Sequence, residues 1–537
     1  MTSMPAPQDA FYAEPEPDLA PEASVEITSP AAVVRLTERP DVARVKGVYA
    51  LVNTSLTPHQ AMVEDLLFVR KVLDQAQIPY LLVRGNDARP VMAVNWEQRD
   101  ELRAALVAAC ADEPFYSLTM DAKKKTARLV ADGELADGDR ARAIRLYRPR
   151  IEPTGGLRYG QGTGVQVELW RWDNGLIHLP IENSLTRRTL PAVEAVRGEV
   201  ERYGYRWPTI ENMFADHATD IDFEIDIVFS WVDGNNREYQ QYRNSFMENA
   251  VVGEGDDAEA RFRQIDELRY ALRSVYMFAP WIRRIFICTD SPLPEWLDAE
   301  HPDIRVVRSE EHFRDSAVLP VFNSQAIEAQ LQHIEGLGEH FLYSNDDMFF
   351  GRPVGPDMFF SPGGITKFVE ADTRIGLGDN HLDRSGFENA ARVNRKLLHD
   401  RFGRITTRHL EHCAAPLRKS VLLEMEEEFA DEFKSTAASR FRAKDNISVT
   451  NSLYHYYALL TGRAVTNPGA EVLYVDTTMY SGLKKLEKLL QKRNRDFFCL
   501  NDGSFPEVPA EERQRVVTDF LARYFPFRAP WEKAPSA

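Results

Sequence analysis

The stretch FEIDIVFSWVDG, residues 223–234, decides the fold of this chain. It is a largely apolar run that stops at Asp233 and Gly234, and such a run is typical of a strand covered on both faces, as in a parallel sheet. A glycine after the carboxylate lets the backbone bend and approach a ligand closely. Asp233 could therefore hold a divalent cation or a ribose hydroxyl, and a plain Asp-Gly turn is the alternative.

Similar units follow between residues 263 and 350. A helix is predicted from Asp266 to Met277, a second buried strand at 281–290 ends in Asp290, and a third short strand follows at 304–311. A helix at 323–334, capped by Asn323 or Ser324, leads to a fourth strand at 340–350. Strands alternating with helices predict an α/β core that is doubly wound around a mostly parallel sheet, with ligands beyond the carboxyl ends of the strands.

The rest of the chain suggests additional parts around this core. Residues 1–44 are acidic and rich in Pro, so we expect a disordered tail, and residues 45–215 predict an N-terminal α+β accessory domain. Residues 222–537 form the predicted catalytic domain, with helical additions after the core. An Arg-rich stretch at 140–150 either meets an anionic glycan or is a solvated face.

Composition excludes several classes of protein. The chain has 537 residues and a net charge of -17, which argues against a nucleic-acid partner. It has no apolar run long enough to span a membrane and no signal-peptide pattern. Its four cysteines form no CxxC pair, which favours a reducing compartment. We expect a cytoplasmic protein that could associate peripherally with the inner face of the membrane.

An acidic motif interrupts the fourth predicted strand at Asn345, Asp346 and Asp347. Adjacent carboxylates repel each other unless a cation or strong donors compensate. Mg²⁺, or Mn²⁺, prefers such oxygen ligands and usually bridges them to substrate phosphates. The motif therefore predicts a metal site, and a solvated Asx turn is the alternative.

Two later segments carry further chemistry. His409 and His412 have i,i+3 spacing, which would place both on one helical face, and a neutral imidazole there could deprotonate an acceptor hydroxyl. Arg440 and Arg442 could clamp a diphosphate. Asp445 could add a metal ligand or simply cap the next helix. Each histidine could equally be structural.

These motifs resemble those of the Stealth family of bacterial capsular and exopolysaccharide phosphotransferases, which shares its catalytic regions with N-acetylglucosamine-1-phosphotransferase. The similarity extends from residue 222 to the C-terminus in four blocks, in the family's order. The blocks are IDIVFSWVDGNN at 225–236, the segments 263–297 and 319–354, the segment 395–429, and FFCLNDGSFPE at 497–507.

The resemblance implies transfer of hexose-1-phosphate from a UDP-sugar, with a divalent cation. His412 matches the histidine that looks like the general base, with His409 as a less secure alternative. Asp233 and Arg442 match further catalytic positions. The implied metal ligands are Asp346, Asp347 and Asp445. The implied substrate-binding residues are Asn323, Asn345, Arg440, Asn501 and Asp502. The inserted modules of the animal enzyme are missing, so a glycan acceptor is the better expectation.

The expected reaction is therefore phosphodiester formation between a UDP-hexose, such as UDP-N-acetylglucosamine, and a glycan hydroxyl, with UMP leaving. A metal-dependent glycosyltransferase that breaks the sugar–phosphate bond would use the same acidic motifs. A noncatalytic glycan-binding protein and a metal-dependent hydrolase are further alternatives. No GxxxxGK[ST] loop occurs, so ATP is not the expected donor.

Overall fold

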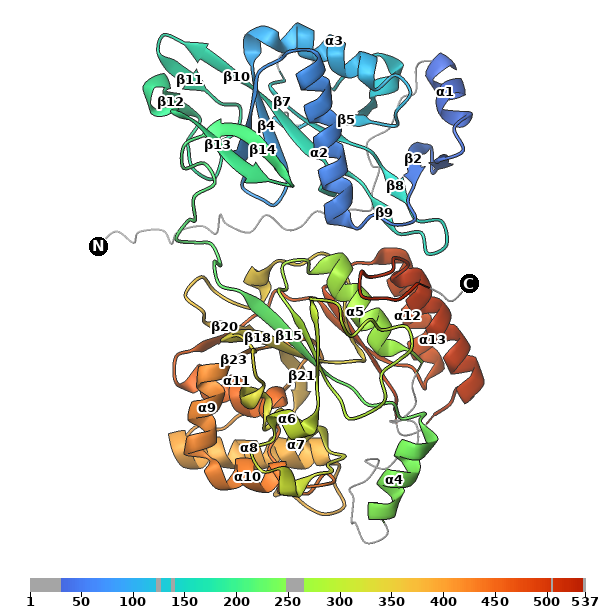
Figure 1. Cartoon of the computed structure of the whole chain (residues 1–537), viewed down its shortest axis with the longest axis vertical. Coiled ribbons are helices and arrows are strands. Elements are labelled where there is room, and N and C mark those ends of the chain that lie inside the picture. The colour runs from blue at the N-terminus through green and yellow to red at the C-terminus, as the bar shows by residue number, and fades with distance from the viewer. Residues whose placement is uncertain (1–29, 122–126, 137–140, 248–264, 504–505, 535–537) are drawn as a thin grey trace, which may run out of the picture. The chain divides into compact units, whose positions relative to one another are not determined.

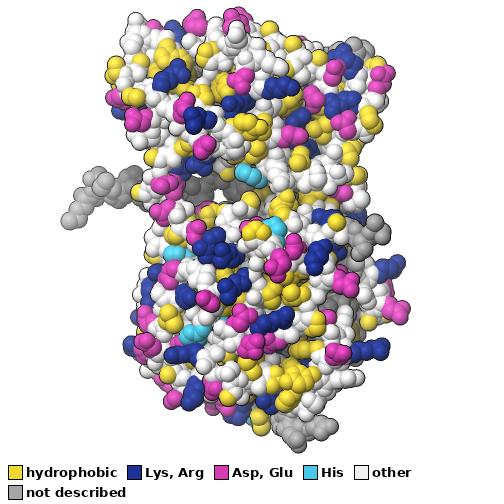
Figure 2. Space-filling view, in the orientation of Figure 1, with side chains coloured by type: hydrophobic (Ala, Val, Ile, Leu, Met, Phe, Trp, Pro, Cys, Tyr) yellow, Lys and Arg dark blue, Asp and Glu magenta, His cyan; other side chains and the backbone are white. Residues whose placement is uncertain are grey.

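The computed structural model describes residues 30–121, 127–136, 141–247, 265–503 and 506–534. The chain divides into two compact units, Met1–Ala215 and Asp216–Ala537. Figure 1 shows strands and helices in both units, so the mixed α/β class is confirmed. Over the face drawn in Figure 2, basic and acidic side chains are interspersed. Among the described residues, no helix is both long enough and apolar enough to cross a membrane.

The predicted disordered tail is only partly testable, because residues 1–29 lie outside the described residues. Its remaining part is folded, so the prediction of disorder through residue 44 is wrong there. Helix α1 spans Pro30–Thr37, and strand β1, Val42–Val45, pairs with β2, Val48–Val52, in an antiparallel hairpin. Lys46 and Gly47, both at positive φ, make the turn. The hairpin is short and follows a Pro-rich stretch, so the sequence pattern did not predict it.

The first unit is built on an eight-stranded sheet, with helices α2 (Pro58–Gln75) and α3 (Arg99–Ala109). A capping box on Thr57 starts α2. The sheet strands are β3 (Tyr80–Arg84), β4 (Pro90–Asn95), β5 (Tyr116–Thr119), β6 (Ala127–Leu129), β7 (Ala143–Tyr147), β10 (Val165–Asp173), β11 (Leu176–His178) and β12 (Thr189–Pro191). Strands β8 (Arg150–Ile151) and β9 (Arg158–Tyr159) extend the β1–β2 sheet, and β13 (Arg197–Arg202) pairs with β14 (Tyr205–Ile210).

The Arg-rich stretch of this unit is not a solvated face in its second half. Arg148 Nε donates to Asp65 Oδ1 at 2.7 Å, and Arg150 Nη2 donates to the same oxygen at 2.8 Å. Asp65 lies on α2 and its side chain is fully buried. Removing one partner of such a buried network typically costs about 3–5 kcal/mol. The solvated-face reading is therefore wrong for Arg148 and Arg150, which tie β8 to α2.

The second unit contains a five-stranded sheet in the order β17-β16-β15-β18-β23. Four strands are parallel: β15 (Ile225–Ser230), β16 (Ile285–Cys288), β17 (Ile304–Val307) and β18 (His340–Asn345). Strand β23 (Ala415–Arg418) is antiparallel to β18 at the edge. The apolar runs predicted as buried strands are thus neighbours in one sheet.

A second, three-stranded sheet has the order β19-β26-β25. Strand β19 (Met348–Phe350) follows β18 after only Asp346 and Asp347, so the single broken strand expected from the sequence is two strands in two sheets. Strand β25 (Val472–Asp476) leads to helix α12 (Tyr480–Lys492), and β26 (Phe497–Asn501) leads to α13 (Ala510–Tyr524). The acidic motif therefore lies at the junction between the sheets.

The remaining elements of the second unit cover these sheets. The helices are α4 (Arg237–Met247), α5 (Glu267–Phe278), α6 (Ser309–His312), α7 (Ser324–Glu328), α8 (Gly386–Phe402), α9 (Lys419–Glu428), α10 (Ala430–Ala437) and α11 (Tyr454–Leu460). A π-helical turn, η9 (Val449–Leu453), precedes α11. The strands β20 (Thr366–Phe368) and β24 (Ala464–Thr466) form one pair, and β21 (Glu370–Arg374) and β22 (Arg408–Leu410) form another.

One hydrophobic core joins the five-stranded sheet to the helices. Val228, Phe286 and Phe341 from the strands pack with Leu398 of α8 and Leu422 of α9, all nearly fully buried. Burying a side chain of this size contributes about 1.5–3 kcal/mol relative to leaving it exposed. This core fixes the strands, and with them the loops at their carboxyl ends.

The C-terminal segment is fastened to α5 by charge. Arg273 donates two hydrogen bonds to the buried carboxylate of Glu532, at 2.6 and 2.8 Å, and Arg269 adds one at 2.7 Å. These guanidinium groups offset the burial of Glu532 and hold the pKa of its carboxyl below the usual value. The segment after α13 is thus held against α5.

Candidate active site

The carboxyl ends of β15 and β18 lie side by side. Ser230 is the register partner of Asn345, and its hydroxyl donates to Asn345 Oδ1 at 3.3 Å. Ser230 also shares a 2.7 Å hydrogen bond with the hydroxyl of Tyr343. Asp233 follows Ser230 by three residues and Asp346 follows Asn345 directly. The two acidic motifs predicted from the sequence therefore leave the sheet at the same edge.

Asp233 shapes the turn after β15. The backbone N–H of Asn235 donates to Asp233 Oδ1 at 3.1 Å, which is an Asx turn. The backbone N–H of Asp233 donates to the hydroxyl of Ser291, just beyond β16, at 2.9 Å. The turn proposed as the alternative role is present, and it holds the half-buried Asp233 against the neighbouring strand end.

Asp347 is half-buried, and its carboxylate has little compensation. The thiol of Cys499, on β26, donates to its Oδ2 at 3.5 Å, and its Oδ1 has no hydrogen-bond partner. Burial, together with the charge of Asp346, raises the pKa of Asp347 to about 7. An orphaned, buried acceptor beside a second carboxylate is the arrangement that a cation would relieve.

The end of β26 approaches this carboxylate from the other sheet. Thr477 donates to Asp502 Oδ1 at 2.6 Å, and the buried Arg513 forms an ion pair with the same oxygen at 3.2 Å. The charge of Asp502 also raises the pKa of Asp347, so the two carboxylates are close. Asn501, the last residue of β26, is the register partner of Asp476 on β25. The predicted Asn501–Asp502 motif thus joins the Asp346–Asp347 edge.

The predicted metal ligands are only partly assembled. No group of three or more His, Cys, Asp or Glu side chains in the described part of the chain could hold a metal ion. Asp445 is exposed, pairs with Lys444 at 2.7 Å and accepts from Asn380 at 2.7 Å. It also caps no helix, since the N-cap before η9 is Ser448. Asp346 and Asp347 alone fit a Mg²⁺ that takes its other ligands from phosphate and water.

His412 does not lie on a helix, so the helical reading of the His409–His412 pair is wrong. His409 belongs to β22, and His412 follows in the loop before β23, because strand β22 pairs with β21 across a bulge. Both rings still contact Phe387 of α8, with centroid distances of 4.7 Å for His409 and 6.1 Å for His412. Burial lowers the pKa of His412, so its imidazole is neutral at pH 7.

His412 and Asp347 lie over the same face of the three-stranded sheet. The ring of Tyr474 on β25 contacts His412 at a centroid distance of 5.2 Å. Tyr474 is the register partner of Cys499, whose thiol reaches Asp347. Register partners on adjacent strands project to the same face of a sheet. The predicted base and the acidic pair therefore lie over one face of this sheet.

Asn323 positions the segment that carries Arg440 and Arg442, called the arginine segment below. This side chain is 1% exposed, caps α7 and donates to the backbone oxygen of Ser439 and to Asn446, so it positions the segment rather than reaching a substrate. Arg442 donates to Ser324 at 3.0 Å, and its charge acts on Tyr343 at the end of β18.

Arg440 points elsewhere than Arg442. It stacks over Phe246 at 4.4 Å and donates to the backbone oxygen of Pro320 at 3.0 Å. Of the two predicted arginines, Arg442 is therefore the one that the structure brings to the edge of the sheet.

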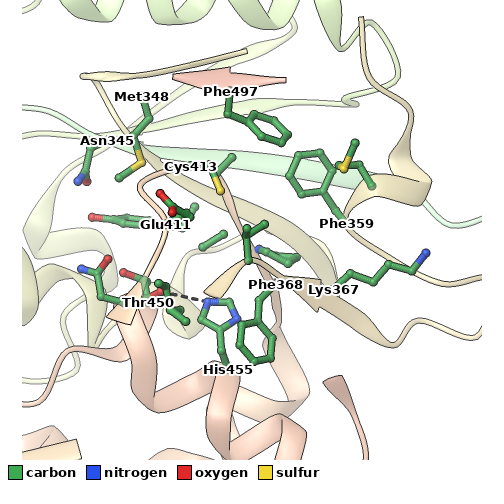
Figure 3. A pocket seen from close by; sticks show the side chains of 18 residues that line it. Asn345, Met348, Phe359, Lys367, Phe368, Glu411, Cys413, Thr450, His455 and Phe497 are labelled. Carbon is green, nitrogen blue, oxygen red and sulfur yellow. Dashed lines mark hydrogen bonds between the residues drawn. The ribbon is translucent and has the colours of Figure 1, made fainter. Parts of the chain in front are cut away.

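A pocket lies directly behind this edge (Figure 3). Its lining includes Asn345, which precedes Asp346, and Cys413, which follows His412. Glu411, Thr450 and His455 also line it, and none of the three was predicted. The hydrogen bond from His455 Nε2 to the backbone oxygen of Thr450, 3.0 Å, spans the π-helical turn η9. Such turns are frequent at functional sites, but sequence patterns do not reveal them.

Burial shifts the pKa of two groups that line this pocket. It lowers the pKa of His455 to about 3 and raises the pKa of Glu411 above its ordinary value. His455 is therefore neutral at pH 7, and its Nδ1 has no hydrogen-bond partner. The pocket therefore presents a neutral imidazole next to the acidic edge, together with Glu411 and Lys367.

Comparison with known proteins decides the family. Family models match three segments: Stealth protein CR2, conserved region 2, at residues 261–368; CR3, conserved region 3, at 411–459; and CR4, conserved region 4, at 487–537. The exopolysaccharide phosphotransferase CpsY of Mycobacterium tuberculosis (strain ATCC 25618 / H37Rv) is 60% identical over 497 residues, covering 93% of each chain. The chain belongs to the Stealth family.

Other relatives of this Stealth protein carry similar names. An exopolysaccharide phosphotransferase of Nocardia farcinica (strain IFM 10152) is 52% identical over 498 residues, covering 92% of each chain. The crystal structure of galactosyltransferase LgtC with donor and acceptor sugar analogues aligns with a TM-score of 0.27 at 13% identity, covering 55% of this chain and 95% of that chain. In this Stealth protein, Asp346 and Asp347 fall in conserved region 2, and His412 falls in conserved region 3.

Proposed function

We propose that this Stealth protein is an exopolysaccharide phosphotransferase, a transferase that moves hexose-1-phosphate from a UDP-hexose, such as UDP-N-acetylglucosamine, to a hydroxyl of a glycan. The names of its relatives support the class of enzyme. In this proposal the core is doubly wound, the donor binds beyond the carboxyl ends of β15 and β18, and the unit Met1–Ala215 is accessory. The reaction takes place in the cytoplasm, at the inner face of the membrane.

One observation carries the proposal: the buried Oδ1 of Asp347 has no partner and lies beside a second carboxylate, Asp346. In this proposal Asp346 and Asp347 hold Mg²⁺ or Mn²⁺, which when bound would neutralise charge on the donor diphosphate and on the leaving group. Asp502 is already paired with Arg513, so it supports the edge without being a ligand.

The side chains of the protein supply the remaining chemistry. His412, neutral at pH 7, accepts the proton of the acceptor hydroxyl at its unprotonated ring nitrogen. The acceptor oxygen then bonds to the phosphorus that carries the sugar, and the bond from that phosphorus to the bridging oxygen of UMP breaks. Arg442 balances negative charge on the phosphoryl oxygens. The bond between sugar and phosphate stays intact, and the product is a phosphodiester.

Product analysis tests this proposal. The full chain is incubated with UDP-hexoses, Mg²⁺ and a glycan acceptor, and the released nucleotide is identified. We expect UMP and a phosphodiester-linked product. Release of UDP would instead support the rival glycosyltransferase, which breaks the sugar–phosphate bond. No turnover, with donor binding indifferent to a chelator, would support a noncatalytic glycan-binding protein.

A further inference from the structure

Three arginines outside the predicted site converge on one glycine-containing loop. Arg395 Nη2 donates to the backbone oxygen of Gly376 at 3.0 Å and approaches that of Gly378 at 3.5 Å. A methyl group added at Gly376 would lie 2.3 Å from Arg392 Nη2, and one added at Gly378 would lie 3.6 Å from Arg384 Nη2. The three guanidinium groups are thus gathered around the backbone of residues 376–378.

Among the described residues, the guanidinium groups of Arg384, Arg392 and Arg395 form no ion pair with a carboxylate. Arg392 is 6% exposed, and its Nη1 donates to the backbone oxygen of Glu388 rather than to an acid. The Nε atoms of Arg384 and Arg392 are buried without any hydrogen-bond partner. Uncompensated like charges at a partly buried position are costly unless an anion joins them.

The charges act on one another. Burial and the neighbouring charge of Arg384 lower the pKa of Arg392. The exposed acid Glu388 acts in the opposite direction, and the charge of Arg395 adds a smaller lowering. Guanidinium groups are weakly hydrated and present several N–H donors in one plane, which suits the oxygens of a phosphate. A multiply charged oxyanion would satisfy both the unpaired donors and the charge.

This cluster borders the candidate active site. Burial and the charge of Arg392 lower the pKa of His409, and burial and the charge of His409 lower the pKa of His412. The loop that carries Arg384 is fastened to the arginine segment, because Asn380 donates to the backbone oxygen of Lys444 at 2.9 Å. An anion bound here would therefore lie on the His412 side of the site, next to the segment that carries Arg442.

We propose that Arg384, Arg392 and Arg395 form a phosphate-binding site beside His409. The phosphate has two sources that share this chemistry: the diphosphate of the nucleotide donor, or a phosphodiester already present in the growing acceptor chain. The choice between these sources rests on the proposed function. The existence of the anion site does not.

Binding of inorganic phosphate to the full chain tests the site. We expect R384Q and R395Q each to weaken one phosphate site at least tenfold in titration calorimetry. K396Q is the matched control, because Lys396 follows Arg395 on α8, is exposed and pairs with Asp400. It should bind phosphate within twofold of the wild type. Wild-type phosphate affinity in both arginine variants would overturn the proposal. R392Q, at a buried position, is added only if its melting temperature matches that of the wild type.

Steady-state kinetics then assigns the source. A raised KM for the UDP-hexose in R395Q identifies the donor diphosphate. A raised KM only for an acceptor that carries a phosphodiester, and not for its uncharged counterpart, identifies the growing chain. Unchanged KM for both substrates would overturn the link to the reaction. A chain that binds phosphate here but releases no UMP would refute the proposed function and leave the site standing.

Discussion

Cys499 donates its thiol hydrogen bond to Asp347 across 152 residues of sequence, from the central strand of the three-stranded sheet. The thiol donates to Oδ2 of Asp347, whereas Oδ1 of the same carboxylate has no hydrogen-bond partner. A thiol is a weak donor, so it offsets little of the cost of burying the charge. The protonation of Asp347 should therefore govern how the protein responds to pH.

Stability of the metal-free protein should fall as pH rises. The folded state holds the proton of Asp347 until about pH 7, whereas an unfolded chain releases it near the ordinary value of 3.8. Between these values the folded state binds more protons, so the free energy of unfolding decreases with increasing pH. Asp347→Asn should remove this decrease, so its free energy of unfolding at pH 8 should exceed that of the wild type by roughly 2–4 kcal/mol. Urea unfolding between pH 5 and 8 measures the free energy of unfolding of both proteins. If it changed with pH in parallel in the wild type and in Asp347→Asn, the prediction would be contradicted.

Mg²⁺ should stabilise the protein through Asp346 and Asp347, not through Asp445. A bound cation stabilises the folded state by mass action, by about 2.7 kcal/mol at one hundred times its Kd. We expect Mg²⁺ to raise the Tm of the wild type and of Asp445→Asn, because Asp445 is exposed and paired with Lys444. Asp346→Asn and Asp347→Asn should lose the shift. Calorimetric melting with Mg²⁺ or chelator checks this, and loss of the shift in Asp445→Asn would bring that residue into the metal site.

His412→Ala should keep the fold and lose turnover. Removing a general base typically costs about 10²–10⁴-fold in kcat. The KM for the donor should change little, since His412 is proposed to act on the acceptor hydroxyl. His399→Ala is the control, because His399 is an exposed histidine of α8. Release of UMP measures both variants. Wild-type kcat in His412→Ala would remove this residue from the role of base.

Gly482→Ala should disturb the end of β25. A methyl group at this position would lie 1.8 Å from the backbone oxygen of Asp476. Overpacking of this kind typically costs about 1–3 kcal/mol. Gly363→Ala is the matched control, because a methyl group there would meet nothing within 4 Å. Thermal unfolding compares the two, and we expect a lower Tm only for Gly482→Ala. Equal Tm values would show that the turn before α12 can relax.

Local patterns predicted the parallel strands well. The apolar runs that end in Asp233, Asp290 and Asn345 are neighbouring strands, because buried parallel strands carry their pattern within a few residues. The environment of Asp347 could not be predicted in the same way. It depends on β26, which no local pattern pairs with β19.

Sequence spacing alone does not predict the local structure in two places. The i,i+3 pattern of His409 and His412 suited a helix, but the pairing of β22 with β21 determines the backbone there. The repeated arginines before residue 150 suited a solvated face, yet α2 supplies Asp65 from a distant part of the sequence. Both errors arise because tertiary pairing overrides a short periodic signal.

The position of β26 between β19 and β25 has a consequence for biosynthesis. Until residues 497–501 leave the ribosome, β19 has an open edge and the acidic pair has no thiol facing it. Ligand-binding competence in this enzyme should therefore arrive late, after the final strand docks, and a nascent chain halted before that strand should capture neither cation nor donor.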